Sequence, residues 1–301
     1  MLTTCTVRFA QAFSSKSATC ILGRHSTTTT TTTSVLWQRA MSTSTKEEDA
    51  PICPDSLLES VLANKKDQET MVGNEVANAV WSLYKADAVC FDVDSTVIAE
   101  EGIDVLAEYL GKGAAVAELT KQAMEGNTKF EDAIQARLDL MRPSQPQITK
   151  MLDEIPLQLT KGIEGLIKSL QEKKVDVWLV SGGFRIMIEP VAQQLNIPIS
   201  NIVANTILFD SNGDYDTFDK NEPTSRDMGK PKALQMIQKQ KGYQTMVMVG
   251  DGATDAQAKP PAKAFIGFGG VVERQQVKEK ADWFVTDFDS MTSVINMRTT
   301  S

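Results

Sequence analysis

The chain of 301 residues is poor in the side chains that carry the commonest forms of nucleophilic catalysis. It has one histidine, His25, near its N-terminus, and four cysteines, none of which forms a CxxC pair. The chain beyond His25 can therefore hold no Ser-His-Asp triad, no Cys-His pair and no histidine-ligated zinc. The cysteine pattern also argues against a disulfide scaffold and favours a reducing compartment. If this part is an enzyme, its acid–base chemistry depends on carboxylates, lysine, hydroxyls or a metal held by oxygen.

Long apolar runs and a basic surface are missing as well. No run approaches the ~18 apolar residues that a membrane-spanning helix needs. The net charge is −8, and all 39 acidic residues follow residue 46. This acidic body argues against partners such as nucleic acid or an anionic membrane. The composition is otherwise that of a globular protein of about two domains.

Residues 1–46 differ from the rest of the chain in having no acidic residue and a run of seven threonines at Thr27–Thr33. This composition is typical of a disordered transit peptide for a mitochondrion or a chloroplast (plastid), with an untargeted tail as the alternative. Residues 47–86 are expected to form a linker and an N-terminal helical segment, which Ser56 and Glu59 would open at capping-box spacing. The basic residues of the first segment are Arg8, Lys16, Arg24, Arg39 and Lys46.

Short apolar runs alternate with stretches of helical spacing from residue 87 onward. Several runs are apolar throughout, as expected for strands that are buried on both faces. The alternation predicts an α/β fold with a doubly wound, mostly parallel, Rossmann-like sheet, whose ligand lies beyond the carboxyl ends of the strands. Asn212-Gly213 indicates a small hairpin. The expected strands are Ala88–Asp92, Val175–Val180, Ile202–Leu208, Thr245–Val249, Ala264–Phe268 and Trp283–Val285.

One interval, residues 100–170, shows helical spacing alone. Apolar residues recur at i, i+3, i+4 and i+7 from Ile103, and a second stripe runs from Phe130 to Met141. We expect a small helical cap here, with return to the core, inserted so that it lies over the carboxyl edge of the sheet. The α/β core would then comprise residues 87–99 and 171–301.

Two pairs of acidic residues follow predicted strands. Asp92 and Asp94 end the first strand, and strand alternation would turn both carboxylates to the same side. Asp251 and Asp255 follow a later strand, and the ends of parallel strands meet at one edge, so the four carboxylates are expected to converge. Such a cluster requires a cation, and Mg²⁺ prefers oxygen ligands. For the first pair alone, a solvated Asp-rich turn that caps a helix is the alternative.

Two further segments could bind a phosphate. Ser181-Gly182-Gly183 follows a strand and would present a hydroxyl and bare N–H groups at the start of a helix. Lys230 opens a later helix and could neutralise an anion, although a surface lysine is the alternative. Neither signal is specific when taken alone.

Together these segments resemble the haloacid dehalogenase (HAD) superfamily of aspartate-nucleophile phosphohydrolases. The resemblance is closer to the phosphoserine phosphatase family within it, and it covers roughly residues 75–290. Residues 1–46 fall outside this resemblance. The matching segments are Asp92-Val-Asp-Ser-Thr-Val-Ile98, Glu101-Gly-Ile-Asp104, Ser181-Gly-Gly-Phe-Arg185, Asn196-Ile-Pro198, Lys230, Gly250-Asp-Gly-Ala-Thr-Asp255 and Ala264-Phe-Ile-Gly-Phe-Gly-Gly270.

The resemblance implies Mg²⁺-dependent hydrolysis of a small molecule, O-phospho-L-serine, as the last step of serine biosynthesis. It implies that Asp92 is the nucleophile, which forms a phosphoaspartate, and that Asp94 is the general acid and then the base. Mg²⁺ would be bound by Asp92, Asp251 and the backbone carbonyl of Asp94, with Asp255 supporting the metal site. The implied substrate-binding residues are Ser95, Glu101, Met124, Arg137, Ser181, Gly182, Gly183, Lys230 and Thr254.

The cap residues of this set would contact the serine part of the substrate. Arg137 lies within the apolar stripe that begins at Phe130, and a buried arginine needs an anion. The substrate carboxylate would serve, with an internal salt bridge to a cap Asp or Glu as the alternative. Met124 could equally be a core residue, and Glu101 could be an acid favoured at a helix start.

Other functions are compatible with parts of this pattern. A related phosphatase or phosphotransferase for another small phosphoester, such as phosphohomoserine, would share the motifs. A receiver-type module, which accepts phosphate on Asp without turnover, would lack Asp94 and the inserted cap. A dinucleotide-binding fingerprint fails because Val272 takes the place of the third glycine, and Cys90 lacks the CxxxxxR loop of cysteine phosphatases. A homodimer is compatible with the sequence, which does not fix the oligomeric state.

Overall fold

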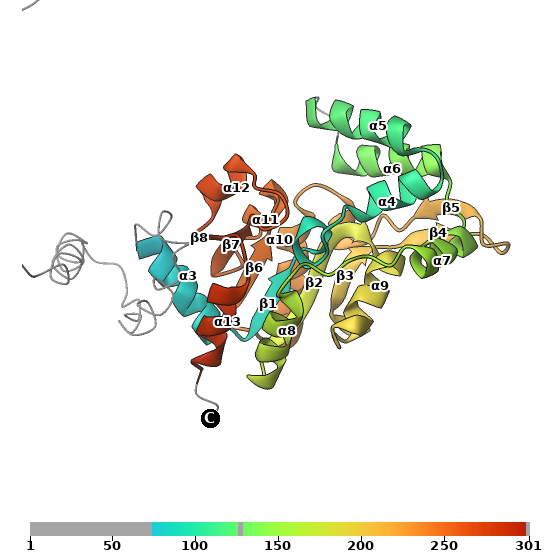
Figure 1. Ribbon diagram of the computed structural model, residues 1–301. Helices are drawn as coiled ribbons and strands as arrows, with labels where there is room; N and C mark the ends of the chain where they lie inside the picture. Colours follow the sequence, from blue (N-terminus) through green and yellow to red (C-terminus); the bar gives the residue numbers. More distant parts are fainter. Residues whose placement is uncertain (1–73, 126–128, 299–301) are drawn as a thin grey trace, which may run out of the picture. The chain divides into compact units, whose positions relative to one another are not determined.

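The computed structural model of the chain describes residues 74–125 and 129–298, and for residues 123–125 it describes the backbone alone. The expected transit peptide and the helix expected near Ser56 lie outside these residues. Six parallel strands form the central sheet, in the order β3-β2-β1-β6-β7-β8 (Figure 1). They are β1 (Ala88–Phe91), β2 (Asp176–Phe184), β3 (Ile202–Asn205), β6 (Met246–Gly250), β7 (Ala264–Phe268) and β8 (Trp283–Val285).

Helices cover both faces of this sheet because alternate strand residues point to opposite sides. In β1, Val89 and Phe91 join the core on one face, while Ala88 and Cys90 join the core on the other. The first face is covered by α3 (Asn74–Lys85), α8 (Ile163–Glu172), α9 (Arg185–Gln194) and α13 (Asp289–Asn296). The second is covered by α10 (Gly229–Lys241), α11 (Ala253–Ala256) and α12 (Gln275–Lys280). The predicted doubly wound parallel sheet is therefore confirmed.

The strand order reverses at β1. The chain runs from β1 to β2 and β3 on one side, and then returns to β6 on the other side of β1. The N–H of Asp92, which follows β1, donates to the carbonyl of Val249 in β6 at 2.9 Å. In sheets of this kind, ligands bind beyond the carboxyl ends of the strands at such a reversal.

The expected strand Ile202–Leu208 is divided in the structure. β3 ends at Asn205, and β4 (Ile207–Phe209) pairs antiparallel with β5 (Tyr215–Phe218) in a separate two-stranded sheet. The division falls at the polar residues Asn205 and Thr206, and Leu208 beyond it is 39% exposed. The hairpin expected at Asn212-Gly213 is confirmed, and Gly213 has the positive φ of 82° that its turn requires.

Three helices follow the first strand, as the helical spacing predicts. They are α4 (Gly102–Tyr109), α5 (Gly113–Glu125) and α6 (Phe130–Met141), and they pack side by side beyond the carboxyl ends of β1 and β2 (Figure 1). The predicted stripes bury Leu106 and Ala107 in α4 and Ile134 and Leu138 in α6. The chain then returns through α7 (Gln145–Glu154) to α8, which packs against β2 and α13.

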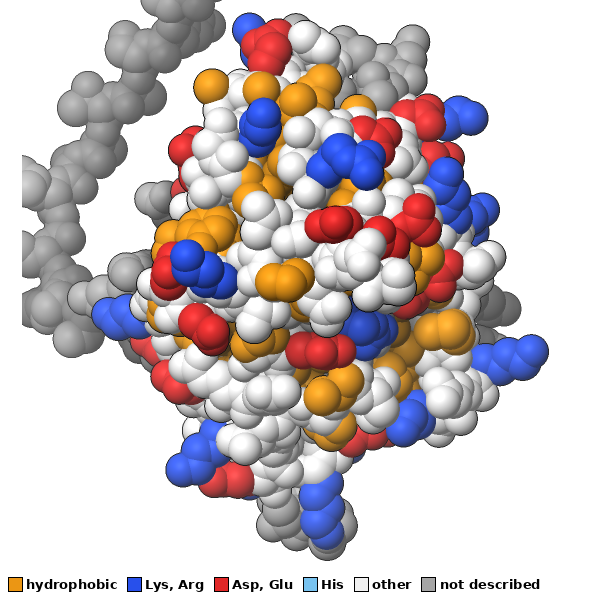
Figure 2. Space-filling view, turned by 90° about the vertical axis from the view of Figure 1, so that its right-hand side faces the viewer, with side chains coloured by type: hydrophobic (Ala, Val, Ile, Leu, Met, Phe, Trp, Pro, Cys, Tyr) orange, Lys and Arg blue, Asp and Glu red, His pale blue; other side chains and the backbone are white. Residues whose placement is uncertain are grey.

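The described surface is mixed in charge on the face shown in Figure 2. Acidic and basic side chains are interspersed there, without a broad patch of either sign among the described residues. No helix in the described ranges is both long enough and apolar enough to span a membrane.

Candidate active site

The segment that follows β1 turns sharply. Residues Val93–Val97 form a tight, non-helical turn that is closed by the N–H of Ile98, which donates to the carbonyl of Val93 at 3.0 Å, and Ser95 within it has a left-handed φ of 54°. Asp92 opens this turn, and its Oδ1 accepts a hydrogen bond from the N–H of Val93 at 2.8 Å. A left-handed conformation is costly for a residue with a Cβ, so its presence here indicates a constrained turn. The sharp turn delivers two carboxylates within three residues.

These two carboxylates do not point together as strand alternation suggested. The strand ends at Phe91, so the alternation does not extend to Asp94. The Oδ1 of Asp94 accepts the N–H of Gly102 at 2.7 Å, and its Oδ2 accepts the hydroxyl of Ser181 at 3.5 Å. Asp94 therefore contacts the start of α4 and the end of β2, and it stands outside the close group of three acids although it lines the same cavity as Asp92.

The other three acids converge as expected from the parallel strands. Asp92, Asp251 and Asp255 are buried, and one carboxylate oxygen from each lies within 4.8 Å of the others. Lys230 is buried beside them, with its Nζ 2.8 Å from Asp92 Oδ2 and in an ion pair with Asp255. Asp251 is buried next to them, and its Oδ2 forms an ion pair with Arg274. Three buried carboxylates that bring one oxygen each this close together suit a divalent metal ion.

The charges in this cluster perturb one another. Burial raises the pKa of Asp255 to about 7, and Asp92 adds to this shift while Lys230 opposes it. Burial would lower the pKa of Lys230, but the carboxylates of Asp255 and Asp92 outweigh that effect and raise it. Lys230 is therefore held as a cation, and the acids around it are under-compensated without a metal.

Asp94 is perturbed in the same direction. Burial raises its pKa to about 7, and the nearby carboxylates of Glu101 and Asp92 contribute further. The hydrogen bond from the N–H of Gly102 opposes this shift without cancelling it. A carboxyl group with a pKa near neutrality can both give and take a proton.

The end of β2 approaches Asp94 closely. β2 continues through Gly182 and Gly183 to Phe184, beyond the predicted end at Val180, and it is bulged between Val180 and Phe184. A Cβ on Gly183 would lie 2.7 Å from Asp94 Oδ2, and one on Gly182 would lie 2.9 Å from the ring of Phe130. Only glycine fits at these two positions without displacing a neighbour.

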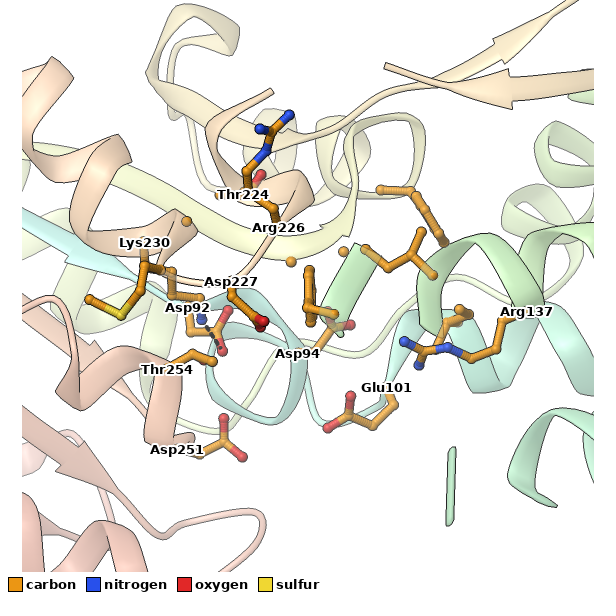
Figure 3. A pocket seen from close by; sticks show the side chains of 18 of the residues that line it. Asp92, Asp94, Glu101, Arg137, Thr224, Arg226, Asp227, Lys230, Asp251 and Thr254 are labelled. Atoms are coloured by element: carbon orange, nitrogen blue, oxygen red, sulfur yellow. Dashed lines mark ion pairs between the residues drawn. The ribbon is translucent and has the colours of Figure 1, made fainter. Parts of the chain in front are cut away.

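The cap contributes side chains of opposite charge. Arg137 points from α6 toward the cavity, and Glu101 lies below it at the start of α4 (Figure 3). The Nε of Arg137 donates to the carbonyl of Ala133 at 2.9 Å, and no carboxylate among the described residues forms an ion pair with its guanidinium. Burial lowers the pKa of Arg137, while Asp104 and Glu101 oppose this shift. Glu101 accepts the hydroxyl of Ser95 at 2.8 Å.

Most of the predicted site residues line one cavity of about 320 Å³ (Figure 3). Ser95, Ser181 and Asp255 do not line it, but each is buried and bonded to a residue of the site. Met124 belongs to α5, and its side chain lies outside the described residues. The predicted residues that line the cavity are Asp92, Asp94, Glu101, Arg137, Gly182, Gly183, Lys230, Asp251 and Thr254.

Five polar or flexible lining residues were not predicted from the sequence. Arg274 forms ion pairs with Asp251 and, at 3.7 Å, with Glu101, and it donates to the backbone carbonyl of Asp251 at 3.0 Å. It follows β7, so its place after a strand that ends at the same edge could have identified it. The others, all in the segment before Lys230, are Thr224, Arg226, Asp227 and Met228.

Comparison with known proteins agrees with this geometry. The family profile of the haloacid dehalogenase-like hydrolases matches residues 86–259. The chain is 53% identical over 203 residues to phosphoserine phosphatase of Bos taurus, covering 67% of this chain and 90% of that protein. It is 52% identical over 207 residues to the chloroplastic phosphoserine phosphatase of Arabidopsis thaliana, covering 68% of this chain and 70% of the relative.

Solved structures show the same relationship. The crystal structure of a phosphoserine phosphohydrolase-like protein from Francisella tularensis matches with a TM-score of 0.59 at 30% identity. The match covers 68% of this chain and 98% of that one. The chain therefore belongs to the haloacid dehalogenase-like hydrolases and, within them, to the phosphoserine phosphatase family.

Proposed function

We propose that this chain hydrolyses O-phospho-L-serine to L-serine and phosphate, with Asp92 as the nucleophile and Mg²⁺ as the cofactor. The observation that carries the proposal is the division of charge within one cavity. Lys230 lies at one end, beside Asp92, and Arg137 and Glu101 lie toward the cap. A phosphomonoester whose other end carries both a carboxylate and an ammonium group matches this arrangement.

The chemistry at phosphorus follows from Asp92 and Asp94. A carboxylate oxygen of Asp92 attacks phosphorus in line, and the bond from phosphorus to the serine oxygen breaks. Asp94 gives its proton to the leaving serine oxygen, which completes L-serine and leaves a phosphoaspartate. Asp94 then takes a proton from a water molecule, which attacks phosphorus, releases phosphate and restores the carboxylate of Asp92.

Neighbouring groups stabilise the phosphate. Lys230 already pairs with Asp92 and would neutralise the phosphate oxygens. Ser181 and the bulged end of β2 at Gly182–Gly183, which we call the glycine turn, would add hydrogen-bond donors. Asp92, Asp251 and the backbone carbonyl of Asp94 would hold Mg²⁺, with Asp255 as support. When bound there, Mg²⁺ supplies positive charge that offsets the negative charge of the carboxylates and of the phosphate.

The cap selects the rest of the substrate in this proposal. The guanidinium of Arg137 would bind the serine carboxylate, and the carboxylate of Glu101 would bind the ammonium group. Met124 and Thr254 would contact the substrate as well. We regard residues 100–170 as the cap with its return to the core, and residues 87–99 and 171–301 as the catalytic core.

The cellular setting is proposed from the first residues and from one relative. The acid-free, basic composition of residues 1–46 and the chloroplastic name of the Arabidopsis relative support import into a plastid. The reaction would then complete serine biosynthesis in that organelle.

The test is phosphate release from O-phospho-L-serine by the purified protein, with Mg²⁺ and with excess chelator. Phosphohomoserine and phosphoethanolamine serve as comparison substrates, the first longer by one methylene group and the second without the carboxylate. The proposal predicts rapid, Mg²⁺-dependent release from phosphoserine above both others. Full activity in chelator would contradict the metal assignment, and a preference for either comparison substrate would contradict the substrate assignment.

A further inference from the structure

The fully buried side-chain amide of Asn205, at the end of β3, lies behind the glycine turn of β2. Its side chain is 0% exposed. Its Nδ2 donates to the carbonyl of Gly182 at 2.8 Å, and its Oδ1 accepts the hydroxyl of Thr224 at 3.1 Å. One side chain thus connects the glycine turn of β2 with the short 3-10 helix Pro223–Ser225, which precedes α10.

The turn needs an external constraint because it consists of glycines. Gly182 and Gly183 have no side chains to restrict their backbone, and the ladder between β2 and β3 is interrupted at this point by the bulge. Two glycines in an irregular segment can exchange between several conformations at low cost. The observed conformation therefore depends on contacts from neighbouring elements.

The bond from Asn205 fixes the direction of one peptide unit. The carbonyl of Gly182 and the N–H of Gly183 belong to the same planar, trans peptide, so they point in opposite directions. With the carbonyl held toward Asn205, the N–H of Gly183 points the other way, where it donates to Ser181 Oγ at 2.9 Å. A flipped peptide would lose this hydrogen bond, which holds the hydroxyl of Ser181, a proposed phosphate ligand, in its place beside Asp94.

The other end of the amide leads toward Lys230. Thr224 is 2% exposed, and a Cβ on Gly229 would lie 2.8 Å from its Cα, so this 3-10 helix packs directly on the start of α10. Lys230 is the next residue. The contacts through Thr224 therefore connect the glycine turn to the segment that places the phosphate-neutralising lysine.

We propose that Asn205 is a positioning residue, which holds the Gly182–Gly183 peptide in the orientation that fixes the phosphate-binding hydroxyl of Ser181, and in register with Lys230. The proposal deepens the proposed function, because it assumes that phosphate binds at this turn. An amide suits the position, since it donates at one end and accepts at the other. Neither a carboxylate nor an aliphatic side chain does both.

The chain offers a closely matched control in Asn201. Its side chain is also buried, its Nδ2 donates to the carbonyl of Val177 in β2 at 3.0 Å, and its Oδ1 accepts the hydroxyl of Ser200 at 3.2 Å. Val177 lies near the opposite end of β2 from the turn. Each of Asn201→Ala and Asn205→Ala therefore removes one hydrogen bond to a carbonyl of β2 and one from a neighbouring hydroxyl. The two substitutions differ in how far they lie from the site.

The experiment compares the two variants with the wild-type full chain in Mg²⁺. Calorimetry measures the dissociation constant of inorganic phosphate, kinetics measures kcat and KM for phosphoserine, and a melting curve measures stability. Asn205→Ala should weaken phosphate binding about tenfold or more and lower kcat/KM by at least that factor, because the partly buried carbonyl of Gly182 is left unpaired and free to turn. Asn201→Ala should lower the melting temperature but leave phosphate binding within about twofold of the wild type.

Equal effects of the two variants on phosphate binding, or an unchanged value for Asn205→Ala, would overturn the proposal. If Asn205→Ala does not fold, Thr224 decides: Thr224→Val should weaken phosphate binding while Thr224→Ser, which keeps the hydroxyl, should retain it. Equal phosphate affinities of these two variants would again overturn it. A wild-type protein that binds phosphate but does not hydrolyse phosphoserine would refute the proposed function alone.

Discussion

Replacement of Arg137 by alanine separates a substrate-binding arginine from a structural one. Among the described residues, the guanidinium forms one hydrogen bond, from Nε to the carbonyl of Ala133, and no carboxylate pairs with it. Its remaining N–H groups are therefore available to an anion in the cavity. The loss of charge-assisted hydrogen bonds costs about 1.5–3 kcal/mol, which corresponds to roughly 10- to 150-fold in kcat/KM for phosphoserine.

The assay uses two substrates and two arginines. Phosphoethanolamine lacks the carboxylate, so Arg137→Ala should change its already poor turnover little. Arg137→Lys should restore only part of the phosphoserine activity, because an ammonium group cannot form the bidentate fork. Arg142→Ala is the control, since Arg142 ends α6 and bonds to the carbonyl of Tyr215 without lining the cavity. Equal losses on both substrates, with a melting temperature lowered as in the control, would refute the assignment.

Three further predictions concern the core of the site. Asp94→Asn should retain the fold, as a melting curve would show, but should lose a factor on the order of 10²–10⁴ in kcat, because both proton transfers depend on this carboxyl; a rate near that of the wild type would contradict its role. Without metal, the free energy of unfolding should fall as pH rises from about 5 to 8. The pKa values of Asp94 and Asp255 are raised to about 7, so these carboxyl groups stay protonated in the folded protein at pH values where they ionise in the unfolded chain. The stability present below the ordinary carboxyl pKa is therefore lost as pH rises through 7. The gain in melting temperature on adding Mg²⁺ should then be larger at pH 8 than at pH 5.5, and equal gains would count against a metal at this cluster. Gly183→Ala should lower kcat/KM at least about tenfold because its Cβ would lie 2.7 Å from Asp94 Oδ2, whereas Gly165→Ala, at a helix position with open space around it, should leave kinetics unchanged and raise stability slightly.

The sheet and most of the site could be predicted from local sequence. The runs Ala264–Phe268 and Trp283–Val285 are apolar throughout and bounded by polar residues, and they form strands with those bounds. Because parallel strands end at one edge, the positions of Asp92 and Asp251 after two such runs were sufficient to bring them together. These inferences depend only on periodicity and on the direction of the strands.

The remainder depends on contacts that periodicity does not encode. The direction of Asp94 is set by a tight turn and by the N–H of Gly102, so strand alternation, which ends with β1 at Phe91, does not determine it. The division of residues 202–208 into two strands depends on which partner each half finds, because β3 pairs with β2 and β4 pairs with β5. Arg274 reaches Asp251 across 23 positions of the chain, and it becomes a site residue only when β6 and β7 lie together.

The central claim is that Asp92 carries the phosphoryl group during turnover. The most direct measurement is to quench the protein in acid during turnover of phosphoserine that is radiolabelled in its phosphate, and to locate the label by mass spectrometry of its peptides. The wild-type protein should carry the label on Asp92, and Asp92→Asn should carry none and release no phosphate while it melts like the wild type. Turnover by the wild type without label on Asp92, or substantial hydrolysis by Asp92→Asn, would contradict the account.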